Sequence, residues 1–267
     1  MTGDLHIHSY YSDGYLSPAD AMQHAKEAGC EVVALTDHDA LGGLTEAENA
    51  AHSLGMKFIR GVEISAFDRV DTHILGYGID VENPRFKSFL KKQKERRGER
   101  ARLMIDKLSK CGIVLPKEVF EFKVEREISR SHIADAIVEC GYEPDFNTAF
   151  YKWCRYGVPT YVNIGGPLPG EAVEEIHLAG GLAVLAHPMR IAYEGDELLS
   201  YIEKIASFGI DGIEAEYRDA SENEMRHYVE LSKKLGVFYT SGNDFHGLFN
   251  KIVPRELYCG KLLSIAR

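Results

Sequence analysis

Cysteine is scarce in this sequence, and the cysteines that occur lie far apart. They are Cys30, Cys111, Cys140, Cys154 and Cys259. No two of them form a Cys-x-x-Cys pair, which argues against a zinc site built from thiolates. Their odd number and wide spacing argue against a disulfide framework. We therefore expect reduced, mostly buried cysteines in a cytoplasmic protein.

Long apolar runs and an excess of basic charge are also lacking. No run of 18 apolar residues occurs, so no membrane-spanning segment is expected. The first residues, MTGDLHIHS, contain neither the basic stretch nor the apolar region of a signal peptide. Lysine and arginine number 31 against 41 aspartates and glutamates. Such a chain is a poor general binder of nucleic acid or anionic membranes. A phosphate-bearing substrate still fits, because bound divalent cations reverse the local charge.

The composition predicts a folded α/β protein. Apolar residues make up 45% of the 267 residues and charged residues 27%, which is enough for a sizeable core. The length fits a single α/β barrel that contains an insertion. Strand-like and helix-like segments alternate along residues 1–83 and again after Gly170. This alternation is typical of a largely parallel sheet with helical crossovers.

The expected strands are Gly3–Ser9, Glu31–Leu35, Lys57–Ile64, Thr72–Ile79, Leu182–Ala186, Gly212–Glu216 and Val237–Thr240. The expected helices are Pro18–Gly29, Leu41–Gly55, Ala172–Gly180, Asp196–Phe208 and Glu222–Gly236. Ser17 is a good N-cap for the first helix, with proline at its first position. Only a few residues separate Lys57–Ile64 from Thr72–Ile79, which favours antiparallel pairing of these two strands.

The alternation stops near Asn83-Pro84. From Arg85 to about Tyr156 no strand is predicted. The run Lys91–Arg102 (KKQKERRGERAR) is typical of an exposed helix face. We interpret residues 84–165 as an inserted helical cap subdomain, and residues 1–83 and 166–267 as the barrel that carries the functional site.

Eleven histidines are present, and six of them lie at the end of a predicted strand or, for one, at its beginning. The six are His6, His8, His38, His73, His187 and His246. Carboxylates accompany them at Asp13, Asp37, Asp39, Glu63 and Asp244. The carboxyl ends of parallel strands form one rim of a sheet, so these side chains are expected to meet in one cleft. We read the helix-borne histidines His24, His52, His177 and His227 as ordinary surface or core residues.

Two pairs in this set have the spacing of shared ligands. His6 and His8 face the same side of an extended strand, as do Asp244 and His246 if that segment is extended. Ligation by nitrogen and oxygen alone suits Mn²⁺, Fe²⁺ or Zn²⁺. Nine candidate ligands are too many for one ion, so we expect two or three divalent ions bridged by Glu63. Such clusters are used in phosphoryl transfer, because they lower the pKa of bound water and clamp phosphate oxygens.

An ordered set of short motifs resembles the polymerase and histidinol phosphatase (PHP) superfamily. The motifs are DLHIHSYYSDG (Asp4–Gly14), LTDHD (Leu35–Asp39), GVEIS (Gly61–Ser65), HILGYGID (His73–Asp80), LAHP (Leu185–Pro188) and SGNDFH (Ser241–His246). No single motif is decisive, but the ordered set is highly specific. The resemblance implies a distorted (β/α)7 barrel with a trinuclear metal site at the carboxyl ends of its strands.

Position by position, the resemblance implies three sets of metal ligands. The first set is His6, His8, Glu63 and Asp244, the second is Glu63, His73 and His187, and the third is Asp13, His38 and His246. Every ligand position of the pattern is filled, which argues against a non-catalytic copy. The candidate catalytic residues within these sets are Asp13, His38, Glu63, Asp244 and His246. Asn243 stands where the related stretch usually has serine, at a position that is not a ligand.

Within the superfamily, the sequence is most similar to a stand-alone branch that hydrolyses nucleotide phosphates. That branch carries a helical insertion, and ISRSHIA (Ile128–Ala134) is similar to its insert motif. Arg130 and His132 are therefore candidate contacts to phosphate or leaving group, as is Arg190 just beyond LAHP. Arginine suits this role because its planar fork grips phosphate oxygens in pairs. The alternative for each is a solvated surface charge.

We therefore predict an enzyme that hydrolyses a phosphate monoester on a nucleotide, by means of a hydroxide that bridges metal ions. The expected substrate is the 3′-phosphate of a nucleoside 3′,5′-bisphosphate. Three alternatives stay open. One is a 5′→3′ exonuclease on short RNA, and another is a histidinol-phosphate phosphatase, which shares the barrel but lacks this insert pattern. The third is a metal-binding accessory module of a polymerase, which the complete ligand set disfavours. No membrane partner is expected.

Overall fold

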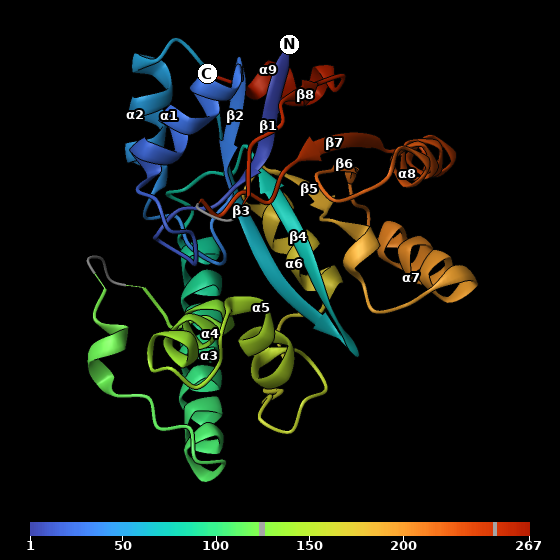
Figure 1. Ribbon diagram of the computed structural model, residues 1–267. Coiled ribbons are helices and arrows are strands. Elements are labelled where there is room, and N and C mark those ends of the chain that lie inside the picture. The colour runs from blue at the N-terminus through green and yellow to red at the C-terminus, as the bar shows by residue number, and fades with distance from the viewer. Residues whose placement is uncertain (123–125, 248–249) are drawn as a thin grey trace. The chain divides into compact units, whose positions relative to one another are not determined.

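The structure is a computed structural model that describes residues 1–122, 126–247 and 250–267. The chain divides into two compact units (Figure 1). Residues 1–90 and 166–267 form the barrel unit, and residues 91–165 form the inserted unit. In the part of the chain that the structure describes, no helix is long and apolar enough to cross a membrane.

Among the described residues, eight strands and most of the helices belong to the barrel unit. The strands are β1 (Thr2–Ile7), β2 (Val32–Leu35), β3 (Lys57–Asp68), β4 (Val70–Tyr77), β5 (Leu182–Leu185), β6 (Gly212–Tyr217), β7 (Phe238–Gly242) and β8 (Arg255–Glu256). The helices are α1 (Pro18–Ala28), α2 (Leu44–Ser53), α6 (Pro169–Leu178), η3 (Pro188–Arg190), α7 (Gly195–Ser207), α8 (Glu222–Leu235) and α9 (Gly260–Ile265).

The strands form one sheet in the order β7-β6-β5-β4-β3-β2-β1-β8. Neighbours pair parallel except at three places: β4 runs antiparallel to both β3 and β5, and β8 runs antiparallel to β1. The predicted antiparallel pairing of the third and fourth strands is confirmed. Because β4 is reversed, its amino-terminal half lies at the same rim as the carboxyl ends of the parallel strands. This reversal explains how His73, early in β4, reaches the same rim as residues at strand ends.

The sheet curls until its first strand meets the segment that follows its seventh. Ile7 and Phe245 form a parallel bridge. The amide of His8 donates to the carbonyl of Phe245 at 2.8 Å, and the amide of Phe245 donates to the carbonyl of His6 at 3.0 Å. The expected seven-stranded barrel is confirmed as a nearly closed barrel, with β8 added at the edge of β1. The sequence reading missed both β8 and α9.

The first helix forms for the reasons that its sequence suggests. Ser17 is the N-cap, and its hydroxyl accepts a hydrogen bond from the amide of Asp20 at 3.0 Å. Pro18 supplies a fixed φ at the first position, where no amide hydrogen is needed. Gly29 ends the helix with φ of 96°, which glycine adopts without the clash of a Cβ. These signals place α1 within one residue of its predicted bounds.

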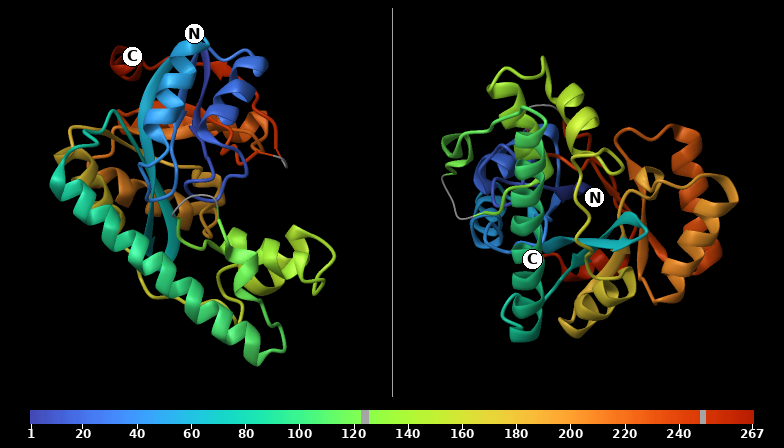
Figure 2. Two further views of the ribbon diagram at one scale, coloured as in Figure 1. Left: turned by 90° about the vertical axis from the view of Figure 1, so that its left-hand side faces the viewer. Right: turned by 90° about the horizontal axis from the view of Figure 1, so that it is seen from below.

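Helix α3 (Pro84–Lys110) is continuous from the barrel unit into the inserted unit (Figure 2). Phe86 and Leu90, near its start, belong to the core around Val62 and Ile176 in the barrel unit. Further along α3, Met104 and other residues belong to a separate core. We predicted that the inserted subdomain begins at residue 84, which is the first residue of α3. The two compact units divide later, between residues 90 and 91.

The inserted unit is helical. It contains the rest of α3, η1 (Lys117–Phe120), α4 (Arg130–Glu139), α5 (Phe146–Ala149) and the π-helical turn η2 (Phe150–Cys154). Among the residues of 84–165 that the structure describes there is no strand, as predicted. The unit has its own apolar core, in which Met104, Leu108, Ile133 and Ile137 are fully buried. A helical insertion into the barrel is thus confirmed, and its role as a cap stays a prediction.

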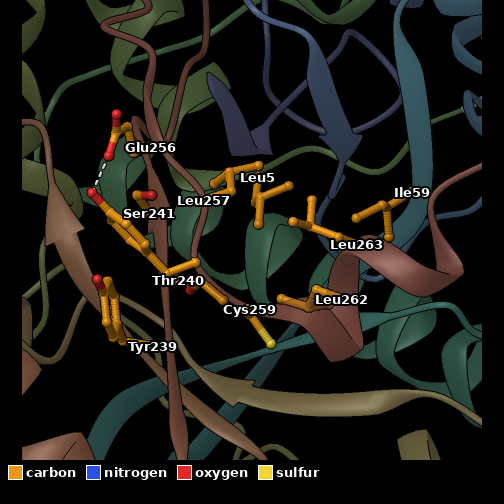
Figure 3. A pocket seen from close by; sticks show the side chains of 11 residues that line it. Leu5, Ile59, Tyr239, Thr240, Ser241, Glu256, Leu257, Cys259, Leu262 and Leu263 are labelled. Carbon is orange, nitrogen blue, oxygen red and sulfur yellow. Dashed lines mark hydrogen bonds between the residues drawn. The ribbon is translucent and has the colours of Figure 1, made fainter. Parts of the chain in front are cut away.

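A small pocket lies where β8 and α9 pack against the barrel (Figure 3). Leu5, Ile59, Leu262 and Leu263 contribute apolar side chains to it. The pocket is close to the amino end of β1, where Thr2 and Gly3 pair with β8. None of the nine candidate metal ligands lines it. This pocket is therefore a gap in the core rather than part of the predicted site.

Asp211 ties three elements of the barrel unit together. Its carboxylate accepts hydrogen bonds from the amide of Ala183 at 3.0 Å, from Lys261 Nζ at 2.7 Å and from His177 Nε2 at 2.9 Å. Burial favours the neutral carboxyl, but the bonds from Lys261 and Ala183 outweigh it and hold the pKa of Asp211 below its ordinary value. The ionised carboxylate therefore links α6, β5 and α9.

Asp211→Asn is expected to lower the free energy of unfolding by about 1–2 kcal/mol at pH 7, because charge-assisted hydrogen bonds are lost. A depressed pKa in the folded state stabilises the protein above the unfolded pKa of about 4, and this contribution disappears as the pH falls through the folded pKa. The difference between wild type and variant should therefore shrink below about pH 4. Urea unfolding at a series of pH values measures it, and a difference that is independent of pH would contradict this account.

Candidate metal centre

All nine predicted ligands come together at one rim of the barrel. His6 and His8 lie at the end of β1, Asp13 in the loop after it, and His38 just after β2. Glu63 lies within β3, His73 within β4, and His187 just after β5. Asp244 and His246 follow β7. The convergence expected from the topology is therefore present in the structure.

Glu63 is the centre of the group. Its side chain is fully buried. Its Oε1 lies 2.8 Å from His73 Nδ1 and 2.9 Å from His187 Nε2. Its Oε2 lies 3.0 Å from His38 Nδ1, 3.2 Å from His8 Nε2 and 3.3 Å from His6 Nε2. Five imidazoles thus surround one carboxylate, and the two oxygens face different histidines.

Asp244 closes the first group of four side chains. Its Oδ1 lies 3.2 Å from His8 Nε2 and 3.6 Å from His6 Nε2. One atom from each of His6, His8, Glu63 and Asp244 falls within 4.8 Å of the others, a spacing able to hold one ion. The other oxygen, Oδ2, accepts a 2.9 Å hydrogen bond from the buried Tyr217 hydroxyl. This bond fixes the carboxylate so that Oδ1 faces the two histidines.

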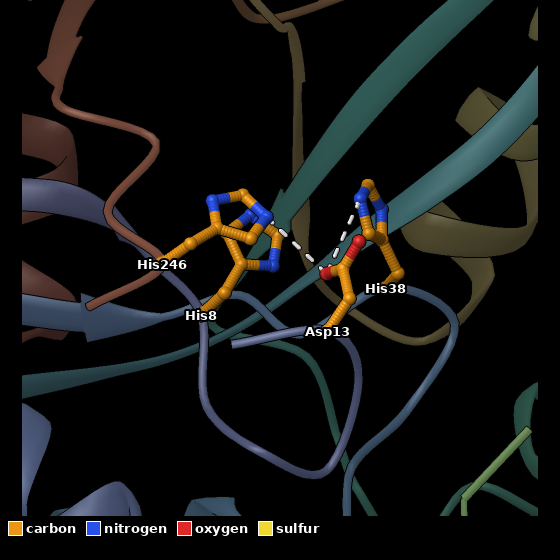
Figure 4. A group of neighbouring side chains, drawn as sticks. All are labelled: His8, Asp13, His38 and His246. Carbon is orange, nitrogen blue, oxygen red and sulfur yellow. Dashed lines mark ion pairs between the residues drawn. The ribbon is translucent and has the colours of Figure 1, made fainter. Parts of the chain in front are cut away.

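Asp13 gathers a second group, drawn in Figure 4. Its Oδ1 lies 3.2 Å from His246 Nε2 and 3.9 Å from His38 Nε2. His8 completes the four, and His38 with Glu63 and His73 forms a third group of metal-ligand spacing. His246 Nδ1 donates to the carbonyl of Asp244 at 2.9 Å, since a carbonyl can only accept. Its Nε2 is thereby left to face Asp13.

Glu214 supports the cluster from behind, and the sequence reading missed it. It is fully buried within β6. Its Oε1 lies 3.0 Å from His6 Nδ1, and its Oε2 accepts the amide of His187 at 2.7 Å. Because a carboxylate accepts, Nδ1 of His6 donates to Glu214, and Nε2 faces Glu63. In GIEAEY this glutamate is one of two in an apolar strand, and nothing there marks it as a partner of His6.

Two further buried aspartates hold the loops of the site. Asp4 accepts from the amides of His6 and Asn243, each at 3.0 Å, and from Asn243 Nδ2 at 2.9 Å. Asp37 accepts from the amide and hydroxyl of Ser9 and from the hydroxyl of Ser12, at 2.6–2.7 Å. Asp4 therefore joins β1 to the SGNDFH segment. Asp37 was predicted to accompany the histidines, and it fixes the loop that carries Asp13.

The backbone is strained at three places around the cluster. Asp39, His187 and Asp244 have φ values of 51°, 24° and 48°. Among the described residues, the one other non-glycine residue with positive φ is Arg69, in the turn between β3 and β4. A positive φ is uncommon for such side chains, and strained residues gather at functional sites. The side chain of His187 faces Glu63, and that of Asp244 faces His8.

The carboxylates of the group are ionised. Burial favours the neutral form of Glu63, but the imidazoles of His38 and His73 hold its pKa well below the ordinary range. The same balance lowers the pKa of Asp13, through His38 and His246, and of Asp244, through His246 and His8. Burial lowers the pKa of His38 to about 4. Burial favours the neutral form of His6 and His8 as well, but the carboxylates around them raise the pKa of both imidazoles, that of His8 to about 10. Ionised carboxylates and neutral imidazoles are the forms that bind cations, so an ion bound here would have to displace the protons of His6 and His8.

Comparisons with known proteins find relatives over most of the chain. The PHP domain profile matches residues 4–135. A 5′-3′ exoribonuclease from Haemophilus influenzae is 34% identical, covering 91% of this chain and 89% of its own length. A 3′,5′-nucleoside bisphosphate phosphatase from Chromobacterium violaceum is 36% identical, covering 91% of this chain and 86% of its own. The chain belongs to the PHP family.

A solved structure agrees with that membership. It is described as an amidohydrolase from Chromobacterium violaceum with bound sulfate and no metal. It superposes with a TM-score of 0.92 at 34% identity, covering 99% of this chain and 96% of that one. As a PHP protein, this chain is a metal-dependent phosphoesterase with several groups of side chains able to hold ions.

Four buried atoms of the PHP site lack hydrogen-bond partners among the described residues, and this indicates whether metal ions fit the site. His6 Nε2, His8 Nε2, His38 Nδ1 and Glu63 Oε2 are buried and form no hydrogen bond with the residues that the structure describes. Buried polar atoms normally have partners, because leaving one unsatisfied costs about 1–3 kcal/mol. All four point at one another, so a cation among them would satisfy them together. The donor set of imidazoles and carboxylates therefore fits divalent ions.

The three candidate substrate contacts divide between the units. Arg190, in η3, belongs to the PHP barrel, with Nη1 3.5 Å from Asp244 Oδ2 and Nη2 3.1 Å from Asp219 Oδ2. Arg130 and His132 belong to the inserted unit, at the start of α4. His132 Nδ1 accepts from the amide of Ser129 at 3.0 Å, as part of a capping box. Sequence reasoning missed Arg218, whose Nη1 donates to the carbonyl of Asp244 at 3.0 Å.

Glu214→Gln is expected to weaken metal binding by the PHP site 10–100-fold, because glutamine lacks the charge and has only one acceptor oxygen for His6 Nδ1 and the amide of His187. Calorimetric titration of the metal-free protein with Mn²⁺ measures this affinity. Glu216→Gln, on the same strand, is the matched control and should bind as the wild type does. Unchanged affinity in Glu214→Gln would show that His6 is oriented by its packing alone.

Proposed function

We propose that this PHP protein removes the 3′-phosphate from nucleoside 3′,5′-bisphosphates. One observation carries the proposal: nine ligand-type side chains, Glu63 among them, lie together in a chain that is 36% identical to a bisphosphate phosphatase. The Haemophilus influenzae relative, at 34% identity, supports a second candidate, a 5′-3′ exoribonuclease. Both candidates hydrolyse a phosphate ester of a nucleotide.

The contacts around Glu63 suggest three ligand sets. His6, His8, Glu63 and Asp244 would hold one ion. Glu63, His73 and His187 would hold a second. Asp13, His38 and His246 would hold a third. Two or three ions of Mn²⁺, Fe²⁺ or Zn²⁺ fit these imidazoles and carboxylates.

Bound divalent ions would supply a nucleophilic water of lowered pKa and would neutralise charge on the phosphate. The residues of the chain prepare that chemistry. Glu63 and Asp244 remain ionised, because the neighbouring histidines lower the pKa of both carboxyls. Tyr217 holds Asp244 in one orientation. Arg190 has a half-exposed side chain beside Asp244, so its guanidinium can pair with oxygens of the departing phosphate.

A panel of phosphate esters tests the proposal. The purified protein with Mn²⁺ is given adenosine 3′,5′-bisphosphate, a 5′-phosphorylated short RNA, histidinol phosphate and an aryl phosphate. The proposal expects the highest kcat/KM for the bisphosphate. The products should be adenosine 5′-monophosphate and inorganic phosphate. Shortening of the RNA with the bisphosphate untouched would replace it by the exoribonuclease. Preference for histidinol phosphate would replace it by that phosphatase.

Arg130→Ala separates substrate choice from metal chemistry. If Arg130 contacts the second phosphate, kcat/KM for the bisphosphate should fall at least tenfold, whereas cleavage of the aryl phosphate and the metal content should not change. Arg190→Ala should lower both activities, because it lies beside Asp244. Equal cleavage of every substrate by Arg130→Ala would remove Arg130 from the site.

A further inference from the structure

The backbone carbonyl oxygen of Asp244 accepts hydrogen bonds from three side chains. Arg218 Nη1 donates to it at 3.0 Å, Asn250 Nδ2 at 2.9 Å and His246 Nδ1 at 2.9 Å. A carbonyl oxygen offers two lone pairs, so three donors saturate it. The guanidinium of Arg218 also carries a charge, and charge-assisted hydrogen bonds are stronger than neutral ones. This carbonyl is therefore an anchoring point for three side chains at the rim of the barrel.

The pairing of β6 with β7 places Arg218 beside this carbonyl. Tyr217, the last residue of β6, lies opposite Gly242, the last residue of β7. Because the two strands are parallel, Arg218 and the segment after Gly242 leave the sheet at the same rim. Only 21% of the Arg218 side chain is exposed, and its Nε donates to Asp219 Oδ2 at 3.1 Å. Two hydrogen bonds, to Asp219 and to Asp244, thus hold the guanidinium in one orientation.

Asn250 ties the same segment together with both ends of its amide group. Its Nδ2 donates to the carbonyl of Asp244, and its Oδ1 accepts the amide of His246 at 3.1 Å. The side chain therefore spans the two predicted ligands of this segment, Asp244 and His246. His246 Nδ1 bonds to the same carbonyl, which leaves its Nε2 3.2 Å from Asp13 Oδ1. The orientation of the His246 ring thus depends on where the carbonyl lies.

Asp244 has a backbone conformation that needs such support. Its φ of 48° lies in the left-handed region, which residues with a Cβ adopt at a cost. Such residues persist where the surrounding structure fixes them, and they gather at functional sites. The carboxylate of Asp244 ends 3.2 Å from His8 Nε2. Release of the carbonyl would let the backbone relax, and the carboxylate would leave that position.

We propose that Arg218 and Asn250 are positioning residues of the metal centre. By holding the carbonyl of Asp244, they fix the direction of two predicted ligands, the Asp244 carboxylate and the His246 imidazole. Neither Arg218 nor Asn250 needs to touch an ion or the substrate for this role. The inference rests on the metal centre of the PHP fold and goes beyond the proposed function, because it holds for whichever phosphate ester is hydrolysed.

Arg218→Met separates positioning from simple electrostatics, because the two effects have opposite signs. Methionine keeps most of the length of the side chain and removes its donors and its charge. Loss of a positive charge near a cation site strengthens cation binding. Loss of an outer partner that orients a ligand weakens binding, typically by about 10–100-fold. We expect calorimetric titration of the metal-free full chain with Mn²⁺ to give an affinity about tenfold or more below that of the wild type.

Two further variants complete the titration. Asn250→Ala removes a neutral donor to the same carbonyl, so it should weaken Mn²⁺ binding by about fivefold. Arg60→Met is the matched control, because the side chain of Arg60 is 31% exposed and donates to a carboxylate, that of Glu48. This control should bind Mn²⁺ within about twofold of the wild type, since Arg60 contacts no predicted ligand through its side chain. Circular dichroism checks the fold of each variant.

Kinetics and spectroscopy report on the orientation of the ligands in two further ways. With saturating Mn²⁺ and the aryl phosphate, Arg218→Met should lower kcat by about tenfold or more and leave KM within about twofold. This division is expected because the arginine orients a ligand and does not hold the substrate. The visible absorption of the Co²⁺-loaded protein depends on ligand geometry, so it should change in Arg218→Met and stay unchanged in Arg60→Met.

The proposal is overturned if Arg218→Met binds Mn²⁺ as tightly as the wild type or more tightly, or if Arg60→Met loses as much affinity. A raised KM with unchanged Mn²⁺ affinity would make Arg218 a substrate contact instead. Should Arg218→Met fail to fold, wild-type affinity in Asn250→Ala overturns the proposal. These outcomes are independent of the proposed function, because the titration contains no substrate. A wild type that binds Mn²⁺ but leaves the bisphosphate intact would remove the phosphatase proposal alone.

Discussion

Asp244→Asn should lower kcat for phosphate-ester hydrolysis by about three orders of magnitude, or about 4 kcal/mol in activation free energy. The amide has the shape of the carboxylate and can keep the hydrogen bond to Tyr217. It lacks the charge that faces His6 and His8 at 3.6 and 3.2 Å. The fold should therefore survive while the first metal is held weakly and orients no nucleophile.

Steady-state kinetics with Mn²⁺ and the aryl phosphate measure this loss, and circular dichroism checks the fold. Asp68→Asn is the matched control, since Asp68 lies on β3 and pairs with Lys204 outside the cluster. It should keep wild-type activity. A value of kcat within tenfold of the wild type for Asp244→Asn would exclude Asp244 from the catalytic machinery.

Glu63→Gln is expected to have the broadest effect of any single substitution. Five histidines face its carboxylate: His6, His8, His38, His73 and His187. The glutamine lacks the charge, so hydrolysis should fall below detection and fewer ions should remain bound after dialysis. In the metal-free protein, loss of a buried charge among imidazoles should destabilise the fold by about 3–5 kcal/mol.

Elemental analysis after dialysis gives the number of ions per chain, and urea unfolding in EDTA gives the free energy. Glu48→Gln serves as the control. The carboxylate of Glu48 lies 2.6 Å from Arg60 Nη2 and does not take part in the cluster. Retention of full metal content by Glu63→Gln would show that the histidines bind ions without a shared carboxylate. Such a result would also exclude the predicted role of Glu63 as a bridge between ions.

Elements with strong local signals could be predicted from the sequence. Ser17, Pro18 and Gly29 mark the bounds of α1, and the run EVVAL marks β2. The close succession of β3 and β4 indicated their antiparallel pairing. By contrast, β8 has only two residues, Arg255 and Glu256, and neither is apolar. Its pairing with β1 depends on tertiary contact and leaves no periodic pattern.

The side chains that gather around Glu63 could be predicted, because histidines recur at the ends of the predicted strands. The side chains that support them could not. Glu214 is one of two glutamates that alternate with apolar residues in β6. Its role depends on His6 and His187, which lie on other strands of the barrel or next to them. Arg218 likewise looks like a surface charge until the carbonyl of Asp244 is placed beside it. Such partners depend on long-range packing, which local sequence does not encode.

The hydrogen bonds that join His6 and His8 to Phe245 also have a consequence for synthesis on the ribosome. His6 and His8 emerge from the ribosome before the other ligands of the site, and the segment that closes the barrel emerges only near residue 245. At 5–20 residues per second, about 10–50 s separate the two. During that interval His6 and His8 belong to an open sheet edge, so a nascent chain can bring these histidines and Asp244 together only after the segment around Phe245 has been made.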